Sequence, residues 1–246
     1  MKVLGVDIGG SAIKAAVVET STGRLCSDRT SIPTPQPATP ERIAACLESL
    51  VKDFSWAGKS LGCGLPAAVQ NGIVRTAANI DRSWIGTRVE NLFREAAGCP
   101  VNVLNDADAA GLAEMAFGEG RNQRGTILVI TVGTGLGSAL FRDGILVPNT
   151  ELGHLILKGQ DAETYASAAV KTRLNLSYEE WVPRLDAYLQ RVEELFWPDL
   201  FIIGGGISTN FARIAPLLEV KTETRPARLV NDAGLVGAAL AARSES

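Results

Sequence analysis

The chain has 246 residues, a formal net charge of −3 and 46% hydrophobic residues. This length and apolar content allow a substantial core, as one large domain or as two lobes. The negative charge argues against a general nucleic-acid binder. No apolar stretch reaches the roughly 18 to 20 residues that a membrane span requires, and residues 2–7 predict a strand rather than a signal region. We therefore expect a cytoplasmic protein that binds neither nucleic acid nor membrane.

The first elements are predicted strands separated by glycine turns. Strands in the order of a β-meander are expected at 2–7, 12–19 and 25–32. A helix with Thr39 as its N-cap is expected from Pro40. Next come a strand at 61–65, an irregular stretch at 72–84, a helix at 89–97, a strand at 101–105 and a helix at 107–118. This alternation of strands and helices is typical of an α/β architecture.

The second half of the chain repeats the beginning of the first. A strand at 126–130, a glycine turn and a strand at 138–142 indicate a structural duplication. The remaining expected elements are helices at 162–173 and 178–196, strands at 200–203 and 227–230, and a closing helix at 235–243. We expect an N-terminal lobe of residues 1–107, completed by 233–246, a C-terminal lobe of residues 108–232, and a cleft between them.

Two glycine turns follow apolar strands that start near residues 2 and 126. The first reads Asp7-Ile-Gly9-Gly10-Ser11 and the second Thr131-Val-Gly133-Thr134-Gly135. Such turns bring backbone N–H groups close to phosphate oxygens, although hairpins between buried strands also use glycine. The neighbouring hydroxyls, and a carboxylate at Asp7 that suits Mg²⁺, favour phosphoryl transfer. Neither turn is a Walker A loop or a dinucleotide fingerprint.

A third glycine segment, Gly204-Gly205-Gly206, ends the strand expected at 200–203. It allows a phosphate chain or nucleotide to approach the backbone, and a plain tight turn is the alternative interpretation. The sequence does not show whether the basic residues Lys14, Lys158, Lys171 and Arg173 form one strip.

Asn105 and Asp106 end the strand expected at 101–105, where ligand sites of α/β sheets usually open. Locally, helix capping is the favoured interpretation, because Asn and Asp are the best N-cap residues. The pair also suits a sugar kinase. In that case Asn105 bonds a substrate hydroxyl and Asp106 accepts the proton of the attacking one.

The only histidine is His154, three residues after Glu151. A single histidine is more often structural than catalytic, but a Glu and a His at this spacing suit adjacent sugar hydroxyls. Asn79 belongs to another polar cluster, for which Trp84 is a candidate pocket wall and a surface turn is the alternative. We expect Asp161 and Glu163 to form a solvated helix start.

Together these segments resemble the ROK sugar kinases of the ribonuclease H-like, actin-like superfold over nearly the full length. Asp7-Ile-Gly-Gly-Ser11 resembles the first phosphate loop, Asn105-Asp106 the catalytic dyad, 131–137 the second phosphate loop, and Glu151-Leu-Gly-His154 the sugar-binding signature. Within the family, the runs at 9–14, 79–86 and 148–154 are most similar to polyphosphate-using glucokinases.

The resemblance implies an α/β fold with two lobes, a homodimer, and a kinase that makes glucose 6-phosphate from polyphosphate, ATP or both with Mg²⁺ near Asp7. It implies Asp106 as the base and Asn79, Asn105, Glu151 and His154 as sugar ligands. The candidate phosphate-binding residues are Asp7, Gly9, Gly10, Ser11, Lys14, Thr131, Gly133, Thr134, Gly135, Gly204 and Gly205.

Some features depart from the family pattern or leave alternatives open. The cysteine-rich zinc motif is absent, and the four cysteines form no Cys-x-x-Cys pair, so we expect no zinc site. Ala12 and Ala15 replace usual glycines, which leaves the choice of donor open. The alternatives are an ATP-dependent glucokinase, a hexokinase of broader sugar range, and a sugar sensor. A DNA-binding repressor is not expected, because the phosphate strand starts at Lys2.

Overall fold

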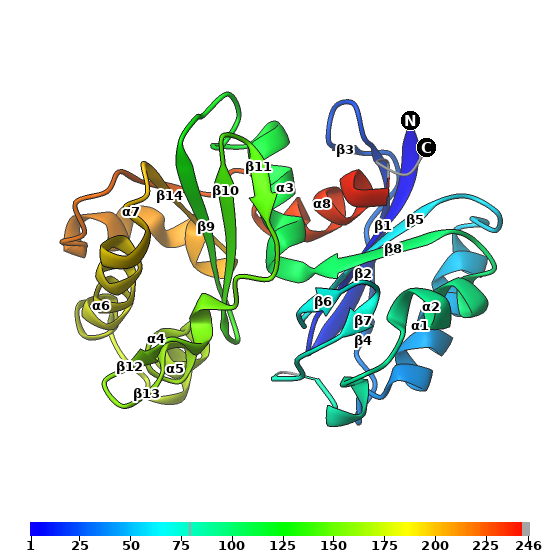
Figure 1. Cartoon of the computed structure of the whole chain (residues 1–246), viewed down its shortest axis with the longest axis horizontal. Helices are drawn as coiled ribbons and strands as arrows, with labels where there is room; N and C mark the ends of the chain where they lie inside the picture. The colour runs from blue at the N-terminus through cyan, green and yellow to red at the C-terminus, as the bar shows by residue number, and fades with distance from the viewer. Residues whose placement is uncertain (79, 243–246) are drawn as a thin grey trace. The chain divides into compact units, whose positions relative to one another are not determined.

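The computed structural model describes residues 1–78 and 80–242 (Figure 1). Asn79, a predicted sugar ligand, and the end of the predicted closing helix lie outside the described residues. The chain forms two compact units. One comprises Met1–Ala113 with the segment from Asp232, and the other is Glu114–Asn231. Among the described residues, no helix is long and apolar enough to cross a membrane.

The first unit contains a mixed sheet with strand order β3-β2-β1-β5-β8, and β4 also pairs with β2. Its strands are β1 (Lys2–Ile8), β2 (Ala12–Glu19), β3 (Arg24–Leu25), β4 (Thr30–Pro33), β5 (Leu61–Leu65) and β8 (Val101–Asn105). β1 and β2 are antiparallel, whereas β1, β5 and β8 run parallel. The predicted strands are confirmed, except that 25–32 is divided into β3 and β4.

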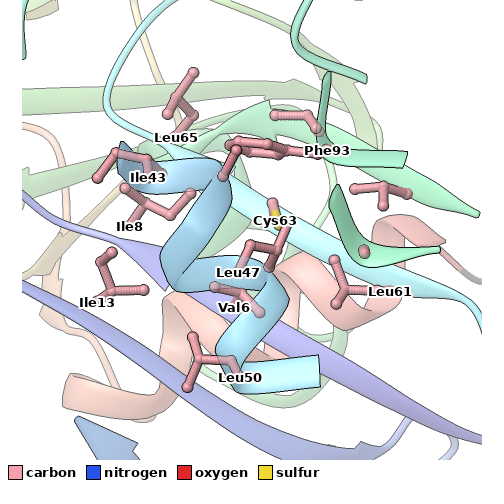
Figure 2. Close-up of a cluster of buried hydrophobic side chains, with 14 of the residues drawn as sticks. Val6, Ile8, Ile13, Ile43, Leu47, Leu50, Leu61, Cys63, Leu65 and Phe93 are labelled. Atoms are coloured by element: carbon pink, nitrogen blue, oxygen red, sulfur yellow. The ribbon is translucent and has the colours of Figure 1, made fainter. Parts of the chain in front are cut away.

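Two helices cover one face of this sheet: α1 (Pro40–Asp53) and α2 (Val89–Ala97). Figure 2 shows the core between the sheet and these helices, and Val6 and Ile8 of β1, Leu47 of α1 and Phe93 of α2 belong to this cluster. Thr39 is the N-cap of α1, as predicted, although its side chain makes no cap bond. The stretch 72–84 contains β7 (Ile73–Val74), which pairs with β6 (Val69–Gln70), and η1 (Arg82–Trp84).

The opposite face of the sheet is covered by α8 (Ala233–Ala241), which begins two residues before the predicted helix. A Cβ at Gly5 would lie 2.1 Å from the backbone oxygen of Leu235, and one at Gly62 would lie 1.8 Å from that of Ala238. Only glycine allows the helix backbone to approach β1 and β5 this closely. The helix at the end of the chain therefore packs directly on the first strands.

The second unit contains a sheet with strand order β11-β10-β9-β14-β15. Its strands are β9 (Thr126–Val132), β10 (Leu136–Arg142), β11 (Ile145–Val147), β14 (Leu200–Gly204) and β15 (Thr224–Pro226). β9 and β10 form an antiparallel hairpin, and β14 runs parallel to β9. This repeats the arrangement of β1, β2 and β5, so the predicted duplication is confirmed. The strand expected at 227–230 was placed three residues too late, and β11 was not predicted.

The core of the second unit lies between its sheet and α6 (Tyr178–Phe196), where Trp181 and Tyr188 pack against Leu128 and Phe201. The expected helix at 162–173 is divided at Ser167, whose backbone is extended. Further elements are η2 (Leu152–His154), β12 (Ile156–Leu157), β13 (Gln160–Asp161), α4 (Ala162–Ala166), α5 (Ala168–Arg173), η3 (Gly206–Asn210), α7 (Phe211–Ile214) and η4 (Ala215–Leu217). Two elements contain residues of both units: α3 (Asp106–Phe117) and η5 (Val230–Asp232).

Candidate active site

The first glycine turn joins β1 to β2 and is fixed by the loop that follows β4. The N–H of Gly9 donates to the oxygen of Ala12 at 3.0 Å. Thr34 donates its hydroxyl to the oxygen of Gly9 at 2.6 Å and its N–H to the oxygen of Ser11 at 3.1 Å. Two carbonyls of the turn are thus satisfied by a single threonine, which holds the turn in one conformation.

Asp7 and Lys14 lie opposite each other on the two strands of this hairpin. The Nζ of Lys14 lies 3.4 Å from a carboxylate oxygen of Asp7. A Cβ at Gly234 would lie 2.8 Å from the carboxyl carbon of Asp7, so the start of α8 packs against this carboxylate. A carboxylate beside a helix N-terminus is favourably placed. The hairpin therefore presents a fixed anion and a cation next to the glycine turn.

A magnesium ion fits the chemistry of this site. Mg²⁺ usually binds one or two carboxylates, keeps several waters and shares phosphate oxygens with a substrate. Asp7 supplies one such carboxylate, with 18% of its side chain exposed. In the described ranges, no group of three or more His, Cys, Asp or Glu residues could hold a metal ion by itself. Asp7 thus suits a cation that arrives with phosphate rather than a cage made only of protein.

Asn105 and Asp106 lie where β8 ends and α3 begins. The side-chain oxygen of Asn105 accepts from the N–H groups of Ala107 at 2.8 Å and Asp108 at 3.1 Å. Its side-chain nitrogen donates to the oxygen of Ala67 at 3.3 Å. The capping interpretation of Asn105 is therefore confirmed. As the buried cap of α3, Asn105 fixes the position from which Asp106 projects.

Asp106 is half-buried, and one of its carboxylate oxygens accepts from the N–H of Ala107 at 2.8 Å. A Cβ at Gly64 would lie 3.4 Å from the Cα of Asp106, within ordinary contact distance. Asp7 on β1 pairs in register with Gly64 on β5, which in turn pairs with Leu104 on β8. The structure thus brings Asp7 and Asp106 to the same carboxyl edge of the first sheet.

The second glycine turn joins β9 to β10. The N–H of Gly133 donates to the oxygen of Gly135 at 3.0 Å, and the oxygen of Gly133 accepts from Ala169 at 3.1 Å. A Cβ at Gly133 would meet no atom within 4 Å, and the φ of this residue is not in the left-handed region. Glycine is therefore not required here by the fold. It leaves open space beside the turn.

The turn after β14 lies beside the second glycine turn, because Gly204 pairs with Thr131. Gly205 has φ +80°, and a Cβ there would lie only 2.4 Å from the oxygen of Val132. Gly205 is therefore required by the backbone, whereas a Cβ at Gly206 would meet nothing within 4 Å. Two glycine turns thus meet at the carboxyl ends of β9 and β14, where ligand sites of such sheets usually lie.

Glu151 immediately precedes the short helix η2, which ends at His154. Its φ of +29° is unusual for a residue with a side chain. The loop is fixed by Ser138, whose hydroxyl oxygen accepts from the N–H of Leu152 and whose carbonyl accepts from Thr150, both at 3.0 Å. Burial raises the pKa of Glu151; the Glu163 charge acts in the same direction and His154 opposes it.

His154 lies between two carboxylates. Its Nε2 is 3.5 Å from Glu151 and its Nδ1 is 3.0 Å from Asp161. The β12–β13 hairpin, whose residues Ile156 and Asp161 pair, brings Asp161 back to the histidine. The prediction of Asp161 as a solvated helix start was incomplete. Asp161 is the N-cap of α4, but its carboxylate contacts His154 instead of capping the helix.

Comparisons with known proteins place the chain in a family. A sequence profile of the ROK family matches residues 3–169. A protein named polyphosphate glucokinase from Mycobacterium tuberculosis is 46% identical over 243 residues, covering 98% of this chain and 91% of that relative. A protein named glucokinase from Streptomyces coelicolor is 30% identical, covering 98% and 97%. The chain belongs to the ROK family.

Solved structures agree with this assignment. The inorganic polyphosphate/ATP-glucomannokinase from Arthrobacter sp. strain KM has a TM-score of 0.97 and 47% identity, covering 100% of this chain and 99% of that one. The ROK family glucokinase from Streptomyces griseus, in complex with glucose and AMPPNP, has a TM-score of 0.83 and 27% identity, covering 99% and 100%. The predicted ribonuclease H-like, actin-like fold of ROK sugar kinases is confirmed.

Proposed function

We propose that this protein transfers a phosphoryl group to the 6-hydroxyl of glucose, with inorganic polyphosphate, ATP or both as donor. One observation carries the proposal: the whole chain has the fold of a polyphosphate/ATP-glucomannokinase, with a TM-score of 0.97. The name of the Mycobacterium tuberculosis relative supports the same reaction. The candidate residues support the same reaction, because the glycine turns and Asp106 lie at the carboxyl ends of strands, where ligand sites of such sheets usually lie.

Asp106 is the base in this proposal. It accepts the proton of the 6-hydroxyl as the oxygen attacks the phosphorus, and a positioned base of this kind contributes ~10²–10⁴ in rate. Because Asn105 caps α3 directly before it, the carboxylate is held by the helix start rather than by a mobile loop. Alignment and charge neutralisation supply most of the remaining acceleration.

Glu151 and His154 bind sugar hydroxyls, together with Asn79 and Asn105. When Asp161 accepts the Nδ1–H of His154, the Nε2 atom keeps a lone pair. This lone pair can accept a hydrogen bond from a sugar hydroxyl or from the protonated carboxyl of Glu151. Asp161 is therefore a positioning residue for His154. Its side chain is 42% exposed, so we expect it to affect orientation more than stability.

Phosphate binds at each glycine turn, beside Ser11 and Lys14 in the first unit and beside Thr131 and Thr134 in the second. The N–H groups of Gly9 and Gly133 are used within their own turns, so neither donates to phosphate. Gly9 allows a tight turn, and Gly133 leaves open space beside the backbone. Asp7 would hold Mg²⁺ or its waters, and the ion would neutralise charge on the transferring phosphoryl group. Gly204 and Gly205 shape the adjoining turn.

A kinase that uses only ATP is the second candidate, and the AMPPNP complex of the Streptomyces griseus relative favours it. The name glucomannokinase, which the Arthrobacter relative carries, supports a sugar range that includes mannose. The homodimer and the cytoplasmic location stay predictions, which sedimentation and fractionation would check.

Initial rates of glucose 6-phosphate formation test the proposal. Polyphosphate or ATP is offered as sole donor with Mg²⁺ at matched phosphate, with glucose or mannose as acceptor, and Asp106→Asn serves as the inactive control. We expect product with polyphosphate. Product with ATP alone would select the second candidate. No sugar phosphate with either donor would overturn the proposal.

A further inference from the structure

Two basic side chains from different helices converge on one aromatic ring in the second unit. The Nζ of Lys171, on α5, lies 4.6 Å from the centroid of the Tyr178 ring, and the guanidinium carbon of Arg213, on α7, lies 4.3 Å from it. Tyr178 packs edge-on against the buried Trp181, with ring centroids 6.2 Å apart. The ring is thus fixed by the core, and it holds both cations in place.

The convergence of these cations has an electrostatic cost. Each cation gains from the ring, but two like charges at one ring repel each other. Glu179 lies close enough to respond: backbone and Ser177 hydrogen bonds lower its pKa, and the charges of Arg213 and Lys171 add to the shift. The carboxylate of the next residue, Glu180, is committed to the cap of α6 through the N–H of Ser177. The charges of both cations thus act on Glu179 in the same direction.

One cation lies on a helix that contacts the second glycine turn, and the other lies on a helix that follows the Gly204–Gly206 turn. α5 is tied to the second glycine turn by the bond from Ala169 to Gly133, two residues before Lys171. α7 follows the Gly204–Gly206 turn through η3 and carries Arg213. The two turns lie side by side, because Gly204 pairs with Thr131. The helices that carry Lys171 and Arg213 are thus both connected to this pair of neighbouring turns.

We propose that Lys171 and Arg213, beside Tyr178, form a binding site for the distal part of an extended polyphosphate chain. This inference rests on the proposed function and adds a location for the long donor. Every internal phosphate of such a chain carries a negative charge, which Lys and Arg bind by charge-assisted hydrogen bonds. Of the residues considered for a basic strip, Lys171 alone belongs to this pair, and Arg213 was not among them.

The proposed site predicts that the effect of removing these cations depends on the length of the polyphosphate donor. A donor of three phosphates occupies the turns, whereas a donor of tens of phosphates also reaches the cation pair. We expect the double variant Lys171→Met, Arg213→Met to lower kcat/KM for long-chain polyphosphate by roughly tenfold or more. The loss with tripolyphosphate should be about threefold or less, and added salt should weaken the wild type more than the variant.

Two matched variants separate this site from net charge and from packing. Lys52→Met with Arg191→Met removes two positive charges from exposed side chains that are paired within their own helices. Lys171→Arg with Arg213→Lys keeps both charges beside Tyr178. We expect each of these two control variants to keep kcat/KM for long-chain polyphosphate within about twofold of the wild type. Thermal unfolding confirms that each variant is folded.

Equilibrium binding of long-chain polyphosphate, without glucose, gives a readout that does not need turnover. We expect weaker binding only for the double Met variant of Lys171 and Arg213. If that variant binds and turns over long chains as well as the Lys52 and Arg191 control does, the site is overturned. If the wild type binds polyphosphate at Lys171 and Arg213 but does not transfer its phosphate, polyphosphate is not the donor, and the proposed binding site still holds. If the wild type does not bind polyphosphate, both fail.

Discussion

Each unit contains a β-hairpin with a glycine turn, but the glycines have different structural roles in the two units. In the first unit, the turn between β1 and β2 is held by Thr34, and a Cβ at Gly9 would come within 3.0 Å of the oxygen of Ala12. In the second unit, a Cβ at Gly133 would meet nothing within 4 Å. Glycine at 9 thus serves a tight turn, whereas glycine at 133 keeps space open. A similar sequence pattern therefore does not imply a similar physical role.

The units also present their polar side chains differently. Asp106 projects from the start of α3, where the buried cap Asn105 fixes it. Glu151 has an unusual backbone angle directly before η2, His154 ends η2, and a carboxylate from the β12–β13 hairpin contacts the histidine. The helix cap in the first arrangement is made by neighbouring residues of one segment, whereas the contact with His154 in the second depends on two segments that meet only in the folded chain.

The largest expected effect concerns the first unit. Asp106→Asn should lower kcat by ~10²–10⁴, because the amide cannot accept the proton. Glucose affinity, measured by calorimetry, should change by about threefold or less. Asp53→Asn, at an exposed position near the end of α1, is the control and should match the wild type. A turnover near normal for Asp106→Asn would remove this residue from the role of base.

Two neighbouring glycines after β14 test the distinction between a glycine that the backbone requires and a glycine beside open space. Gly205→Ala should destabilise the fold by about 2 kcal/mol or more, since it combines positive φ with a contact at 2.4 Å. Gly206→Ala should stay within about 0.5 kcal/mol of the wild type. Denaturant unfolding measures both, and equal stabilities for the two variants would contradict the assignment.

The open space at Gly133 is tested by a single methyl group. Gly133→Ala should leave the unfolding midpoint nearly unchanged, because the added Cβ meets no atom within 4 Å. It should raise the KM for the phosphoryl donor roughly tenfold, since close phosphate approach to this backbone is lost. The KM for glucose is the internal control. An unchanged donor KM would show that the open space serves no phosphate.

The contact between His154 and Asp161 is directly observable, because His154 is the only histidine of the chain. Long-range ¹⁵N–¹H spectra should show a proton on Nδ1 in the wild type. Asp161→Asn should change this state and raise the KM for glucose by about two- to fivefold, with a smaller change in kcat. Asp143→Asn is the control, and identical spectra for Asp161→Asn and wild type would exclude the positioning role.

The smallest expected effect is that of Glu151 on the stability of the folded chain. Because burial raises the pKa of Glu151 above its ordinary 4.5, the folded chain binds this proton more tightly than the unfolded chain. The resulting stabilisation is present below pH 4.5 and is lost as the pH rises through the raised value. Glu151→Gln should therefore gain stability relative to wild type between pH 4.5 and 8, by about 1 °C in Tm. A gain that shrinks as the pH rises would contradict this sign.

Much of the fold could be predicted from local signals. α2 and α6 have the predicted bounds, because apolar spacing and capping residues define them in sequence. β11 was missed because a run of three residues gives no clear alternation. The break at Ser167 was also missed, since its extended backbone, with ψ 161°, has no strong sequence signal.

The candidate site could be predicted only in part, because residue types do not reveal distant contacts. The glycine turns and the cap at Asn105 follow from short motifs. The contact of Asp161 with His154 needs the β12–β13 hairpin, which Lys158-Gly159 could have indicated as a turn. The convergence of Lys171 and Arg213 on Tyr178 needs the packing of three helices, so no local pattern shows it.

The central claim is that each of the two glycine turns binds phosphate. Amide hydrogen exchange with long-chain polyphosphate, in the presence of Mg²⁺ and without glucose, tests it most directly. The account predicts slower amide exchange at residues 9–14 and at residues 131–137, with little change at the C-terminal end of α1. Slower exchange in only one of the two turns, or in neither, would contradict it.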